Sequence, residues 1–142
     1  MNAKLNVVVQ TLAILVFLGL RALSLGWLAV IFIITVVGPA VLLVHLITAL
    51  VAARRDRLPA LASWGYGLTA FFLLLVGLLL PDFGDSNGGW VPLAVVTGIG
   101  GEMGHLDNPA LVDTFSTVGM VGILGYVVAL VVAWAGLLAN RR

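Results

Sequence analysis

Four long apolar stretches dominate the pattern of hydrophobic and polar positions along this chain. They cover about residues 5–20, 26–53, 60–80 and 116–139, and none of them contains Asp, Glu, Lys or Arg. A helix needs about 20 apolar residues to cross about 30 Å of hydrocarbon, and each stretch approaches or exceeds this length. The apolar residues are continuous, whereas strands of a membrane barrel alternate over about 10 residues. The pattern therefore predicts an all-α polytopic membrane domain, with four transmembrane helices in two antiparallel hairpins.

The connections between these stretches differ in length. Residues 21–25 are long enough only for a tight hairpin, and residues 54–59 end in Pro59, which suits a first helical turn because its missing N–H costs nothing there. Residues 81–115 form the one long connection. Asn108 followed by Pro109 is typical of a helix start, so we expect the last helix to begin near Pro109 and to stand clear of the lipid before entering it.

Composition supports lipid as the main solvent. Hydrophobic residues make up 62% of the chain and charged residues only 9%, whereas a soluble domain has roughly 25% charged residues. There are no cysteines, which excludes disulfides, thiolate metal sites and redox cysteine pairs. A net charge of +1 gives no reason to expect a nucleic-acid partner.

The charged residues are sorted between the two sides of the predicted membrane. The side with both termini carries six basic residues and the acid Asp56; the opposite side carries Arg21 and five acids. Basic residues are retained in the cytoplasm, so we expect a multi-pass protein of the cell membrane with cytoplasmic termini and a long acidic extracytoplasmic loop. The six basic residues are Lys4, Arg54, Arg55, Arg57, Arg141 and Arg142, and the five acids are Asp82, Asp85, Glu102, Asp107 and Asp113.

The last apolar stretch carries a row of small residues. They are Gly122, Gly125, Ala129, Ala133 and Gly136. Small residues let helix backbones approach closely, which favours helix association in lipid. The row predicts a partner or oligomer face, and the alternative is contact with another helix of the same chain.

A kink is predicted in the second stretch between Thr35 and Pro39. Proline cannot donate a hydrogen bond to the carbonyl four residues earlier, which here belongs to Thr35. Kinks of this kind serve gating in channels and transporters, and they also occur in static bundles.

His45 is the one ionisable side chain deep inside a predicted span, and it shares a helix face with Thr48. Intramembrane ionisable residues are functional candidates, so a proton, quinone-headgroup or ligand role is one hypothesis for His45 and a hydrogen-bonded structural role is the other. The spans contain no second His and no acid, and such a set is a poor metal or haem site. We therefore expect no cofactor.

The long loop has an apolar centre between polar flanks. Its twelve-residue centre, from Trp90 to Gly101, is too short to span, which indicates a re-entrant or interfacial segment or one that a partner covers. Glu102, His105 and Asp107 follow, and they could form an acid–base or zinc set or simply an acidic contact surface. We expect Trp90 and these three polar residues to make the contacts of the loop.

Three functions follow from this pattern. The first is an accessory or structural subunit of a larger membrane complex, which contacts other subunits or copies of itself through the long loop and the small-residue row. The second is a homo-oligomeric channel or facilitator with an acidic outer mouth. The third is a membrane-embedded enzyme that uses the Glu102, His105 and Asp107 cluster. We favour the subunit and expect no enzymatic activity.

Overall fold

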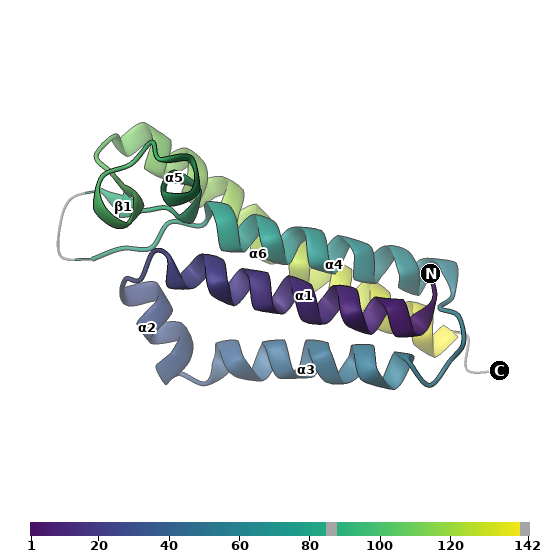
Figure 1. The fold of residues 1–142 in the computed structure, drawn as a ribbon. Coiled ribbons are helices and arrows are strands. Elements are labelled where there is room, and N and C mark those ends of the chain that lie inside the picture. The colour runs from purple at the N-terminus through teal and green to yellow at the C-terminus, as the bar shows by residue number, and fades with distance from the viewer. Residues whose placement is uncertain (85–87, 140–142) are drawn as a thin grey trace.

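The computed structural model describes residues 1–84 and 88–139, and most of them are helical (Figure 1). Asp85, Arg141 and Arg142, which contribute to the predicted charge pattern, lie outside these residues. The long helices are α1 (Ala3–Ala22), α2 (Trp27–Ile34), α3 (Val37–Ala52), α4 (Ala60–Leu79) and α6 (Pro109–Ala139). The short elements are β1 (Gly89–Trp90), α5 (Pro92–Thr97), the 3₁₀ turn η1 (Glu102–Gly104) and β2 (His105–Leu106).

Helices α1, α4 and α6 are each long and apolar enough to cross a membrane. The pair α2 and α3 makes a fourth span only if the bent pair counts as one. The predicted all-helical architecture with apolar helices of membrane-spanning length is thus confirmed, whereas the count of four spans and their arrangement in hairpins stay predictions.

The stretch predicted as one helix over residues 26–53 is two helices in the structure. They meet at an angle of 66°, and the break is at Thr35 and Val36, where Val36 has a φ of 61°. A β-branched residue rarely adopts this left-handed conformation. Pro39 lies in the first turn of α3, where its missing N–H is not needed, and the Thr35 hydroxyl donates to the Ile31 carbonyl at 2.7 Å.

The small-residue row of α6 packs against α4 of the same chain. Added Cβ atoms at Gly65 and Gly136 would lie 2.5 Å from the backbone nitrogens of Ala133 and Ala62, respectively. Gly122 meets Val76 and Leu75 of α4, and Gly125 meets Phe72. The geometry therefore matches the intramolecular alternative, since this face is already covered within the chain.

Residues 88–108 fold into a small unit, here called the loop subdomain. Gly89 pairs with Leu106 and Trp90 with His105 in an antiparallel ladder. Val91, Ala94 and Leu106 form its core, against which Leu93, Val112 and Phe115 pack, the last two from α6. Asn108 caps α6 as expected, because its Oδ1 accepts from the amides of Ala110 and Leu111 at 3.1 and 3.4 Å.

Candidate functional site

His45 stands at the centre of a buried hydrogen-bond chain between helices. Its Nε2 lies 2.9 Å from Gln10 Oε1 on α1, and its Nδ1 lies 3.1 Å from the Tyr126 hydroxyl on α6. Gln10 and His45 are fully buried and Tyr126 nearly so. Both ring nitrogens of His45 therefore have partners inside the bundle.

The hydrogen-bond partners determine which atoms of Gln10, His45 and Tyr126 carry the protons. Gln10 Nε2 lies 3.2 Å from the Tyr66 carbonyl oxygen, which can only accept, so the amide nitrogen of Gln10 faces Tyr66. Its Oε1 then faces His45 and accepts the Nε2 proton, which makes His45 the Nε2-protonated neutral tautomer. Nδ1 of His45 accepts from the Tyr126 hydroxyl in turn.

The series of hydrogen bonds continues from Gln10 to Asn6, which lies one turn earlier on α1. Gln10 Nε2 donates to Asn6 Oδ1 at 3.0 Å. Asn6 Nδ2 and the buried Tyr66 hydroxyl, which lies near Thr48, have no hydrogen-bond partner of good geometry among the described residues. Thr48 donates to the backbone carbonyl of His45 at 2.7 Å and so faces along its own helix.

These bonds connect α6, α3, α1 and α4 in one path. Each interhelical hydrogen bond in lipid contributes on the order of 0.6–2 kcal/mol, and the path opposes sliding of any one helix against its neighbours. The geometry matches the structural hypothesis for His45. Sequence reasoning found His45 but missed Asn6 and Gln10; two amides four residues apart in an apolar stretch share a helix face, and this spacing was the available signal.

A second polar site joins the end of α1 to the start of α2 through a buried ion pair. Arg21 Nη2 lies 2.7 Å from Asp82 Oδ2, and Arg21 Nη1 donates to the Leu80 carbonyl at 2.6 Å. The same carboxylate accepts from the amides of Leu28 and Ala29 at 2.7 and 3.0 Å, so it also caps α2.

The ion pair of Arg21 and Asp82, here called the clasp, depends on a close approach of Asp82 and Phe83 to Gly26, the N-cap of α2. A Cβ added at Gly26 would lie 2.5 Å from both Asp82 Oδ1 and the Phe83 carbonyl oxygen. The Phe83 carbonyl accepts from the Trp27 amide at 2.8 Å. Sequence reasoning treated Arg21 and Asp82 only as members of a charge pattern; a lone Arg on the acidic side was the signal for a pair.

The loop subdomain brings together part of the predicted polar set. His105 Nε2 lies 3.1 Å from Asp107 Oδ1, and the ring of Trp90 packs on that of His105 with centroids 5.1 Å apart. Asp107 and Glu102 are exposed. Within residues 1–84 and 88–139 there is no group of three or more His, Asp or Glu placed to hold a metal ion.

Crevices open between the helices, and two of them are large enough to be considered as ligand sites. The larger, about 460 Å³, lies between α1, α2 and α3 and is almost wholly apolar, with Arg21 in its wall. The other, about 290 Å³, lies between the last turns of α3 and α6, with Thr48, Arg55 and Trp134 in its wall. Both approach or fall within the size range of small-molecule sites, which is about 300–1,000 Å³.

No protein-family model, no curated protein and no solved structure matches this chain.

Proposed function

We propose that this chain is a small accessory or structural subunit of a larger membrane complex, and that it contacts its partner through the loop subdomain. One observation carries the proposal: Val96, Ile99 and Met103 of the subdomain are 60%, 75% and 49% exposed. Together they form what is here called the apolar tip. Such residues on a folded unit outside the hydrocarbon are typical of a protein contact.

The length of α6 supports a position of the apolar tip outside the hydrocarbon. Its 31 residues extend over about 46 Å at 1.5 Å per residue, about 16 Å more than the hydrocarbon is thick. The end that begins at Pro109 exposes Asp113, Thr114 and Thr117, and the subdomain packs on this end (Figure 1).

The neighbouring charges indicate the chemistry of the partner. Glu102 and Asp107 are exposed beside the apolar tip in sequence, so a complementary surface has an apolar centre and basic residues around it. In this proposal the subdomain lies outside the cell and both termini lie in the cytoplasm, which is the orientation that the charge pattern favours. The small-residue row of α6 plays no part in this contact, since α4 covers it.

A homo-oligomeric channel and a membrane-embedded enzyme are the competing functions. The polar groups inside the bundle are bonded chiefly to one another, and in the loop only His105 and Asp107 of the polar set are paired. Among the residues that the structure describes, no specific contact favours the channel or the enzyme.

The test is the mass of the assembly in mild detergent. Chain expressed at its natural level in its own membranes is extracted, and its mass is compared with that of the Ile99→Ser, Met103→Ser double variant. The control is Phe83→Ser, which removes an exposed apolar side chain outside the loop subdomain, at a residue whose carbonyl accepts from the Trp27 amide of α2. We expect a complex well above the 14.9 kDa of one chain for the wild type and the control only. A wild-type chain that runs as a monomer contradicts the proposal.

A further inference from the structure

The crevice between α1, α2 and α3 is bounded by the bend at Val36. Helix α2 leads away from the end of α1, and the 66° bend brings α3 back alongside α1 (Figure 1). The three helices border a space of about 460 Å³, which is in the size range of small-molecule sites. The left-handed conformation of Val36 is costly for a β-branched residue, and strain of this kind is concentrated at ligand sites and switches.

The walls of this crevice continue onto the outer surface of the helices. Leu18 of α1, Ile33 of α2 and Leu43 of α3 line it, and all three side chains are exposed. Exposed apolar side chains on membrane-spanning helices face hydrocarbon, so the crevice is open to lipid from the side. An apolar chain can enter it without leaving the bilayer.

Arg21 is the one polar residue among those that line the crevice. Its Nη1 donates to the Leu80 carbonyl and its Nη2 to Asp82, which are two of the five N–H donors of a guanidinium. The other three have no hydrogen-bond partner among residues 1–84 and 88–139. The residue is 9% exposed. A nearly buried side chain with donors to spare at the end of an apolar crevice favours a ligand that supplies an acceptor.

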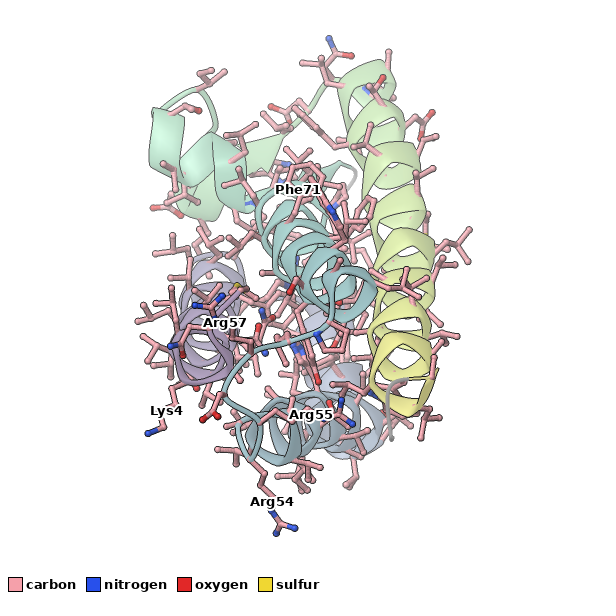
Figure 2. The ribbon with its side chains drawn as sticks, turned by 90° about the vertical axis from the view of Figure 1, so that its right-hand side faces the viewer. Lys4, Arg54, Arg55, Arg57 and Phe71 are labelled. Atoms are coloured by element: carbon pink, nitrogen blue, oxygen red, sulfur yellow. The ribbon has the colours of Figure 1, made fainter. Side chains whose placement is uncertain are left out.

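The charge around Arg21 favours an uncharged acceptor. Asp82 already neutralises the guanidinium at 2.7 Å. The basic residues of the chain that could attract an anion are at the other end of the bundle, which faces the viewer in Figure 2. They include Lys4, Arg54, Arg55 and Arg57.

The position of Arg21 along α1 indicates where that acceptor lies in a bilayer. The 20 residues of α1 extend over about 30 Å, which is the thickness of the hydrocarbon. Arg21 is the last residue but one of this helix. It therefore lies at the boundary between hydrocarbon and headgroups, where the ester carbonyl groups of glycerophospholipids lie.

From this combination we propose that the crevice binds one acyl chain of a glycerophospholipid, and that Arg21 donates a hydrogen bond to the ester carbonyl of that chain. The chain lies between α1, α2 and α3, against Leu18, Ile33 and Leu43. The ester carbonyl is an uncharged acceptor, so the clasp of Arg21 and Asp82 stays intact. The site shares no residue with the apolar tip and requires no partner protein.

The hydrogen bond is tested by native mass spectrometry of the purified full chain. Two phosphatidylcholines with equal chain lengths are titrated separately, one with ester-linked chains and one with ether-linked chains, which lack the carbonyl groups. We expect one bound ester lipid and about fivefold weaker binding of the ether lipid, as for one lost hydrogen bond. Phosphatidylglycerol with ester-linked chains is expected to bind within about twofold of the ester-linked phosphatidylcholine, because Asp82 neutralises Arg21. Equal binding of ester and ether lipids, or a clear preference for the anionic lipid, overturns the proposal.

Two matched pairs of variants locate the site. Ile33→Trp is compared with Ile34→Trp on α2, and Leu18→Trp with Leu15→Trp on α1; all four positions are exposed, and the first of each pair lines the crevice. We expect the first of each pair to weaken binding of the ester lipid by about fivefold or more, because the indole takes the place of the chain, and the second to change it less than about twofold. Equal losses within both pairs indicate lipid spread over the helix surface and contradict a built site. All four variants keep the clasp, so the test does not depend on replacing a buried charge.

Discussion

The Nε2 of His45 and the Oε1 of Gln10 lie 2.9 Å apart in the interior of the bundle, and this bond joins α3 to α1. Both side chains are fully buried. Removal of either leaves the other with an unpaired polar group in the buried interior. The pair thus couples the position of α3 to that of α1 through two single side chains.

A double-mutant cycle tests this bond. We expect Gln10→Leu and His45→Leu each to lower the free energy of unfolding in mixed detergent micelles by about 1–2 kcal/mol, and the double variant to cost less than the sum by about 0.6 kcal/mol or more. Thr35→Val combined with Gln10→Leu is the control, because Thr35 is bonded only within its own helix turn. Additive losses for Gln10 and His45 contradict the bond.

Replacing Tyr126 or Tyr66 with Phe removes the same hydroxyl group from two different surroundings. Tyr126 donates to His45, whereas the Tyr66 hydroxyl is buried without a hydrogen bond of good geometry among the described residues. We expect Tyr126→Phe to lower thermal stability by about 1 kcal/mol and Tyr66→Phe to leave it unchanged or slightly raised, because an unpaired buried hydroxyl is itself a cost. A lower melting temperature for Tyr66→Phe than for Tyr126→Phe argues against the assigned hydrogen bond from Tyr126 to His45.

The ion pair of Arg21 and Asp82 predicts a large loss of stability when Asp82 is replaced by Asn. Asp82→Asn leaves the Arg21 guanidinium buried without its counter-charge and weakens the cap of α2. We expect a loss of about 3 kcal/mol, as for one partner removed from a buried pair. Asp107→Asn, at a carboxylate that is 92% exposed, makes the same exchange and is expected to change little. Comparable melting temperatures for the two variants mean that the clasp does not stabilise the fold.

The close packing of α4 on α6 is tested by two glycines on one helix. An added Cβ at Gly65 meets the Ala133 backbone at 2.5 Å, whereas nothing lies within 4 Å of one at Gly67. Gly65→Ala is expected to destabilise the bundle by about 1–3 kcal/mol through overpacking. Gly67→Ala is expected to be neutral or stabilising by up to about 1 kcal/mol through helix propensity. Thermal unfolding in detergent distinguishes them, and equal shifts would place the helix contact elsewhere.

What the sequence could predict depended on local signals. Continuous apolar stretches were enough for α1, α4 and α6, because a helix satisfies its own backbone. The cap at Asn108 was predictable from the dipeptide it forms with Pro109. The kink between Thr35 and Pro39 was predictable from the proline, whereas the left-handed conformation of Val36, which separates α2 from α3, carries no local signal.

The contacts that define the site join residues far apart in the chain. Arg21 and Asp82 are 61 positions apart, and Gln10 and His45 are 35 apart, so no periodicity connects them. Polar residues in apolar stretches could be identified as unusual from sequence. Their partners required the packing of α1 against both α3 and α4.

We have proposed that the apolar tip of the loop subdomain contacts a partner protein. Photo-crosslinking in native membranes tests it directly, with a photoreactive phenylalanine analogue placed at Ile99 or, as the control, at Phe83. We expect one discrete protein adduct from position 99 and none from position 83. Adducts to lipid alone from position 99, or the same protein adduct from both positions, would contradict it.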